Sequence, residues 1–124
     1  MLAQHCAQAE LWESALQYWR KAGVSARSRR ANREATRCFE QSLSVLAYLP
    51  QTQGNLEVGI DLRFDLRNSL YSFGELDRIL EYLREVERLA RGLNAEARLA
   101  RVGVFLAQAT GDFASQVLMN FSLN

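Results

Sequence analysis

Seven basic side chains between residues 20 and 37 give the sequence its clearest chemical feature. They are Arg20, Lys21, Arg27, Arg29, Arg30, Arg33 and Arg37, and one acidic residue, Glu34, lies among them. Arginine binds carboxylates and phosphates through paired N–H donors, so the segment indicates a contact for an acidic partner. Three interpretations are open: a solvated helix face, a docking surface for acidic protein, and a nucleic-acid contact. Nucleic acid ranks last because no aromatic residue lies between Arg27 and Arg37 to stack on bases.

Side chains for metal binding or nucleophilic catalysis are few. His5 is the only histidine, Cys6 follows it directly, and the second cysteine, Cys38, is distant in the sequence. A zinc site needs three or four converging ligands, and a serine or cysteine nucleophile needs a nearby base. We therefore expect no metal, no cofactor and no enzymatic activity, and two reduced, buried thiols. A nucleophilic or disulfide-bonded Cys38 is the alternative, and alkylation of the native protein tests it.

Three carboxylates, Asp77, Glu81 and Glu85, recur every four residues and would share one face of a helix. Such a face could bind a cation. Because Arg84 and Arg88 alternate with these residues, an ordinary solvated face is the favoured interpretation.

Composition indicates one globular domain over residues 1–124. The chain is 48% hydrophobic and 23% charged, with a net charge of +1, which argues against collagen-like and disordered classes. A single proline and seven glycines disfavour a turn-rich β-sandwich. Residues 1–5 lack the basic start and long apolar core of a secretory leader. No apolar run approaches the roughly 20 residues of a membrane span, so we expect a cytoplasmic protein without membrane contact.

Hydrophobic residues at steps of three and four predict helices along the whole chain. The clearest run is Leu76, Ile79, Leu80, Leu83, Val86, Leu89, Ala90 and Leu93. Asn32, Asn55 and Asn94 are the expected N-caps, and Gly92 is the expected left-handed stop. The breaks predict about seven helices, at residues 2–9, 12–30, 33–48, 55–73, 75–91, 95–109 and 113–120, with Gly23 kinking or splitting the second. Helices of similar length joined by short turns indicate an all-α solenoid of antiparallel pairs.

A small residue followed four positions later by a ring is a more specific pattern. Ala15 precedes Trp19 in this way, and Ala35 precedes Phe39. A small side chain lets two helix backbones approach closely, and a ring one turn further on fills the space beyond it. The spacing, together with Ala22, resembles a tetratricopeptide (TPR) repeat. That resemblance implies an α-α superhelix, right-handed, built from helix pairs.

One part of the chain resembles a narrower family. The stretches LAQH at residues 2–5, ALQYWRKAG at 15–23, SARS at 25–28 and NREA at 32–35 are similar to the TPR-like region of large bacterial signalling ATPases. These include predicted ATPases fused to class III adenylate cyclase domains, and MalT-like regulators. The resemblance is close over about residues 1–50 and general over 51–124. It implies a sensor or scaffold segment, and the chain has no GxxxxGK[ST] phosphate loop.

These patterns predict a non-catalytic protein–protein interaction module that binds a protein or peptide. The expected contact residues are Tyr18, Trp19, Arg27, Arg30, Arg33 and Arg37, where the arginines dock electrostatically and the rings anchor. A helical nucleic-acid-binding or transcription-linked module that uses Arg20–Arg37 is the alternative. The apolar C-terminal residues Val117, Leu118, Met119, Phe121 and Leu123 indicate packing on the preceding helices or on a second copy, which would make a homodimer.

Overall fold

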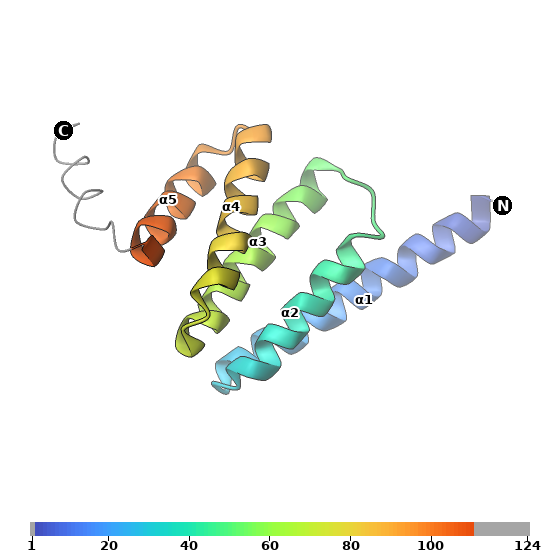
Figure 1. Ribbon diagram of the computed structural model, residues 1–124. Helices are drawn as coiled ribbons and strands as arrows, with labels where there is room; N and C mark the ends of the chain where they lie inside the picture. Colours follow the sequence, from blue (N-terminus) through green and yellow to red (C-terminus); the bar gives the residue numbers. More distant parts are fainter. Residues whose placement is uncertain (1, 111–124) are drawn as a thin grey trace.

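The computed structural model describes the backbone of residues 2–110 and the side chains of residues 8–109, and this part of the chain is helical without strands. The five α-helices are α1 (Leu2–Ser28), α2 (Asn32–Leu46), α3 (Gln53–Leu70), α4 (Leu76–Gly92) and α5 (Glu96–Thr110). A short 3-10 helix, η1 (Tyr71–Phe73), connects α3 to α4 (Figure 1). The all-α prediction is confirmed.

The expected number of about seven helices is wrong, because the two predicted at 2–9 and 12–30 form the single helix α1. Gly23 does not split this helix, which is continuous over Leu2–Ser28. A Cβ atom on Gly23 would lie only 2.6 Å from Cε1 of Phe39, so the glycine allows the Phe39 ring of α2 to pack against the α1 backbone. The helix predicted at 113–120 and the apolar residues from Val117 onwards lie outside the described residues.

Asn55 and Asn32, two of the expected N-caps, do not cap their helices. Thr52, rather than Asn55, caps α3: its Oγ1 accepts a hydrogen bond from the Asn55 backbone N–H at 3.2 Å. The Asn55 side chain instead donates to the Pro50 carbonyl at 2.8 Å and fixes the α2–α3 loop. At α2 the capping position is occupied by Ala31, and Asn32 is the first helical residue.

In the turn after α4 the left-handed residue is Asn94, and the prediction that Gly92 takes this conformation is wrong. Asn94 has φ +54°, and Gly92 is the last residue of the helix. The Ala95 N–H donates to the Ala90 carbonyl at 2.9 Å, which closes the end of α4 in a Schellman-type turn. Asparagine tolerates the left-handed region better than other residues with a Cβ, so it can replace glycine here.

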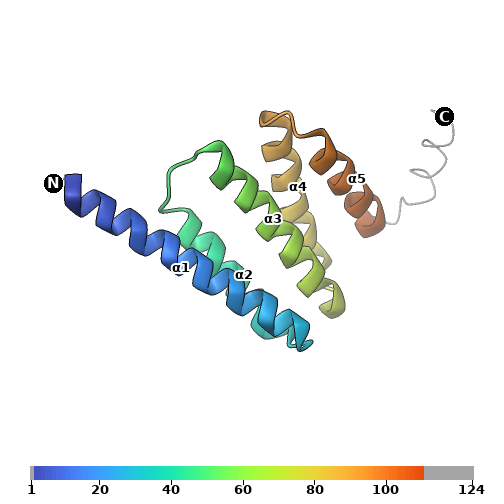
Figure 2. The same ribbon diagram turned by 180° about the vertical axis from the view of Figure 1, so that it is seen from behind.

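The helices alternate between two layers. Every extensive helix–helix contact joins neighbours in the chain: α1 with α2, α2 with α3, α3 with α4, and α4 with α5. Ion pairs show which helices share a layer: Arg27 of α1 with Asp65 of α3 at 3.5 Å, and Arg98 of α5 with Asp61 of α3 at 3.4 Å. Figures 1 and 2 show α1, α3 and α5 on one side and α2 and α4 on the other.

Two hydrophobic clusters hold the layers together, and α3 contributes to both. The first cluster contains Leu16, Ala26, Ala35, Phe39, Val45, Leu49, Leu62 and Leu66. The second contains Ile60, Phe64, Leu70, Ile79, Leu83, Val86, Ala90 and Val102. Burial of Ala35 and Phe39 agrees with the small-then-ring pattern. Ala15 and Trp19 are only partly buried against the first cluster.

Candidate functional site

The turn between α1 and α2 brings part of the basic segment to one place. The chain reverses at Arg30, which has φ +61°. The Ala31 N–H donates to the Ala26 carbonyl at 2.8 Å, and the Arg30 N–H donates to the Arg27 carbonyl at 2.9 Å. This Schellman-type turn holds an arginine where glycine is the usual residue, which leaves the Arg30 side chain exposed at the tip. The first turns of α2 then carry Arg33 and Arg37.

Arg33 and Arg37 are four residues apart and share the outer face of α2. The Arg33 guanidinium carbon lies 4.5 Å from the centroid of the Phe73 ring, a cation–π contact that joins α2 to η1. Arg30, Arg33, Arg37 and Phe73 line a surface hollow of about 410 Å³, and Glu34 lies at its wall as well. We call the three arginines and Phe73 the arginine cluster. An adjoining hollow of about 320 Å³ extends from Arg33 and Arg37 towards Arg78 of α4.

The carboxylates around the arginine cluster are engaged with other arginines. Glu34 pairs with Arg29 at 3.4 Å. Glu40 and Glu75 both pair with Arg78, at 2.7 Å and 3.0 Å. Among the described side chains, no carboxylate lies within ion-pair distance of the three arginines of the cluster. The cluster therefore presents uncompensated positive charge beside an aromatic ring.

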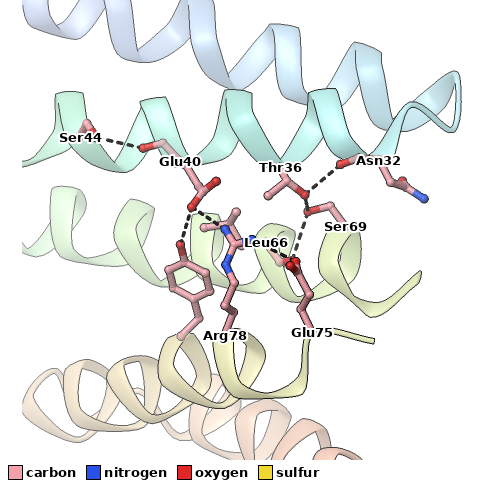
Figure 3. A network of polar contacts seen from close by, with 9 residues as sticks. Asn32, Thr36, Glu40, Ser44, Leu66, Ser69, Glu75 and Arg78 are labelled. Atoms are coloured by element: carbon pink, nitrogen blue, oxygen red, sulfur yellow. Dashed lines mark hydrogen bonds and ion pairs between the residues drawn. The ribbon is translucent and has the colours of Figure 1, made fainter. Parts of the chain in front are cut away.

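A polar network fixes α2 against α3 and α4 beneath the cluster (Figure 3). The hydroxyl groups of Thr36 and Ser69 are both buried and lie 2.8 Å apart. On the same face of α2, Glu40 accepts hydrogen bonds from Arg78 at 2.7 Å and from the Tyr82 hydroxyl at 3.1 Å. Burial, and after it the charge of Glu40, raises the pKa of Tyr82, so this phenol keeps the proton that it donates. The network sets the position from which Arg33 and Arg37 project.

A second contact ties the start of α2 to η1, because the Asn32 side-chain amide donates to the Ser72 hydroxyl at 3.1 Å. Asn32 therefore has a structural role different from the expected N-cap. Since Ser72 adjoins Phe73, this hydrogen bond also helps to place the ring of the arginine cluster.

Three predicted contact residues do not line the hollow of the arginine cluster. Tyr18 is 65% exposed on α1, and its ring meets that of Trp19 edge to face at 5.2 Å. Trp19 is partly buried against the first hydrophobic cluster. Arg27 pairs with Asp65 in the layer of α1, α3 and α5. The structure thus brings together Arg30, Arg33 and Arg37, but does not join them to the other three in one surface.

Phe73 is the member of the cluster that sequence reasoning missed. Phe73 lies 40 residues from Arg33 in the sequence. Its ring is partly buried against the second hydrophobic cluster, and the Arg33 guanidinium group lies over it. Only the tertiary arrangement places η1 beside α2, so no local pattern in the sequence could have revealed the pairing.

The layer of α1, α3 and α5 carries charges that pair with one another. Arg27 meets Asp65 and Arg98 meets Asp61 across neighbouring helices. Burial raises the pKa of Asp65 although Arg27 opposes this effect. Arg67 and Arg101 of the same layer contact aromatic rings instead of carboxylates.

Cys38 is buried, with 6% of its surface exposed. Burial, and after it the charge of Glu34, raises the pKa of the Cys38 thiol, which therefore stays protonated at neutral pH. His5 and Cys6 lie in α1, outside the part whose side chains the structure describes.

In the described part of the chain, no three His, Cys, Asp or Glu side chains come close enough to hold a metal ion. Asp77 and Glu81 are exposed, and Glu85 pairs with Arg88, as the solvated-face interpretation predicts. None of the described helices has the length and apolar character of a membrane-spanning segment.

Comparisons with known proteins give no relative: no family model, no curated protein and no solved structure matches the chain.

Proposed function

We propose that the chain is a TPR-like scaffold that binds an acidic segment of a partner protein through the arginine cluster. The observation that carries this proposal is the uncompensated charge of Arg30, Arg33 and Arg37, in a region where the nearby carboxylates are already paired. Binding an aspartate- or glutamate-rich segment would supply the missing partners, and Phe73 would add apolar contact area. Electrostatic attraction would also speed the encounter.

The proposal also includes the arrangement of the helices as a superhelix of TPR-like pairs. Alternation of the helices between two layers, with contacts between chain neighbours, supports stacking of TPR-like pairs into a superhelix, and the resemblance to TPR repeats implies a right-handed one. A regulatory role beside a bacterial signalling ATPase or adenylate cyclase, in the cytoplasm, follows from the resemblance over residues 1–50. The neighbouring coding sequence tests that role, because the proposal expects an ATPase or cyclase module in the same reading frame.

A labelled glutamate-rich peptide containing one leucine is a suitable probe, with fluorescence anisotropy as the readout. The test variant is Arg33→Ala with Arg37→Ala. The matched control is Lys21→Ala with Arg84→Ala, which removes the same charge from exposed positions outside the cluster. We expect the cluster variant to lose at least about tenfold in affinity and the control to change by less than about threefold. Equal losses in both variants would show attraction by net charge alone and would refute the proposal.

A second variant distinguishes the arginine cluster from the layer of α1, α3 and α5. Exchanging the pair, as Arg27→Asp with Asp65→Arg, keeps the net charge and reverses the local charges on that layer. The proposal expects unchanged peptide affinity. A change as large as that of the Arg33 and Arg37 variant would move the binding site to the other face.

Nucleic acid is a second candidate, favoured by one observation: Phe73 provides an aromatic ring among the arginines, which the basic segment itself lacks. Titration with single-stranded and duplex DNA at low salt separates the two candidates. DNA binding that falls steeply with salt and is abolished by Arg29→Ala with Arg30→Ala would favour nucleic acid over the acidic peptide. Absence of DNA binding at low salt would remove this candidate.

A further inference from the structure

A second cavity lies on the far side of the polar network, between the end of α2, the loop that follows it, α3 and α4. Its volume is about 190 Å³. Leucine side chains from all three helices and the loop form most of its apolar wall, among them Leu46, Leu49, Leu56 and Leu89. A space of this size is large enough for a ring or a short branched hydrocarbon chain. None of the arginine-cluster residues lines it.

Arg63 of α3 supplies the cationic group of this cavity. It is partly buried, and its Nη1 donates to the carbonyl of Gly59 on its own helix at 3.1 Å. Among the described side chains, no carboxylate lies within ion-pair distance of its guanidinium group. A guanidinium group has five N–H donors, so most of the donors of Arg63 have no acceptor among the residues that the structure describes.

The other two charged residues that line the cavity neutralise each other, so the positive charge of Arg63 is not balanced. Glu85 and Arg88 also line the wall. Nε and Nη2 of Arg88 each donate a hydrogen bond to the Glu85 carboxylate, so these two charges pair with each other. Burial lowers the pKa of Arg63, which reflects the cost of keeping this charge away from water. The cavity therefore has a net charge of one positive unit, with leucine side chains around it.

We propose that this cavity binds a small monocarboxylate, whose carboxylate pairs with Arg63 and whose apolar ring or branched chain packs among the leucines. A single anionic group balances the surplus charge, and paired N–H donors match its two oxygens. The small volume and the leucine side chains of the wall favour a small organic acid over an extended acidic segment. This site is independent of the arginine cluster.

Two ligands of the same shape test the proposal on the unaltered protein: 3-phenylpropionate and its neutral amide, 3-phenylpropanamide. Binding is followed by NMR through the Arg63 Nε–H signal and the Gly59 backbone signal. We expect the carboxylate to shift both signals saturably in the millimolar range or below, and to bind at least about tenfold more tightly than the amide. Equal binding of the two ligands, or no saturable shift with the carboxylate, would overturn the proposal.

Substitutions then test whether Arg63 is the residue that binds the carboxylate. Arg63→Met keeps the aliphatic stem and removes the charge, and Arg84→Met is the matched control on an exposed face of α4. Gly59→Ala keeps the charge, but its Cβ would lie 3.1 Å from Nη1 of Arg63 and 3.3 Å from Cδ2 of Leu46, so it should displace the guanidinium group. We expect at least a tenfold loss of carboxylate affinity in Arg63→Met, a smaller loss in Gly59→Ala and no change in the control. Full affinity in Arg63→Met would also refute the proposal, whatever the behaviour of the arginine cluster.

Discussion

Replacing Gly23 by alanine measures how closely α1 and α2 pack. The new Cβ would lie 2.6, 2.8 and 2.9 Å from three atoms of the Phe39 ring, whereas carbon atoms in favourable contact stay about 3.5–4.0 Å apart. Phe39 is 1% exposed, so the ring has little room to retreat. Overpacking of this kind costs about 1–3 kcal/mol, against a gain of about 1 kcal/mol in helix propensity. We expect a net loss of up to about 2 kcal/mol in the free energy of unfolding.

Urea unfolding followed by far-UV circular dichroism measures this loss. Gly103→Ala is the matched control, because Gly103 also lies inside a helix and its added Cβ would meet nothing within 4 Å. The control should gain up to about 1 kcal/mol, so the two substitutions should have opposite signs. In a double-mutant cycle, Phe39→Leu should recover part of the Gly23→Ala loss. A stabilising Gly23→Ala substitution would refute close packing of Phe39 on the α1 backbone.

Four further substitutions test three other features of the structure. Arg30→Gly should raise the melting temperature, because it relieves the left-handed strain of φ +61°, worth about 1 kcal/mol, while it weakens acidic-peptide binding. Thr36→Val and Ser69→Ala should each cost about 1 kcal/mol and show coupling in a double-mutant cycle, and strict additivity would contradict the buried hydroxyl pair. The raised pKa of Asp65 means that the folded state binds its proton more readily than the unfolded state, so ionised Asp65 opposes folding above that pKa. Asp65→Asn should therefore be neutral or stabilising at pH 7, with an advantage that shrinks as the pH falls, and an advantage that grows instead would contradict the assignment.

Helix positions were predictable where one face is apolar and the other charged. The structure places α4 at Leu76–Gly92, one residue from the range predicted by the run of leucines. Burial of Ala35 and Phe39 also followed from spacing, because each lies at the centre of the face that α2 turns towards α1. In both cases the information is local: side chains three and four residues apart share a face.

Features that depend on distant residues were not predictable in this way. Gly23 was interpreted as a break, because glycine is unfavourable within a helix, and only the position of Phe39 explains its presence there. The predictions of N-caps at Asn55 and Asn94 were wrong for a related reason. Both asparagines lie at helix boundaries, but Asn55 serves the preceding loop and Asn94 takes a left-handed turn. An asparagine in the sequence indicates a helix boundary, but it does not show whether the side chain caps the helix, binds the loop or forms the turn.

Both proposed sites depend on which carboxylates are already paired. Beside the start of α2, Glu40 and Glu75 pair with Arg78, and no described carboxylate lies within ion-pair distance of the arginine cluster. In the cavity between α2, α3 and α4, the pairing of Glu85 with Arg88 leaves Arg63 as the excess positive charge. Arginines without carboxylate partners also occur on the layer of α1, α3 and α5, where Arg67 contacts the rings of Tyr71 and Phe105. Unpaired charge alone therefore does not select a site, and the two proposals rest in addition on the hollow beside Phe73 and on the leucine-lined cavity around Arg63.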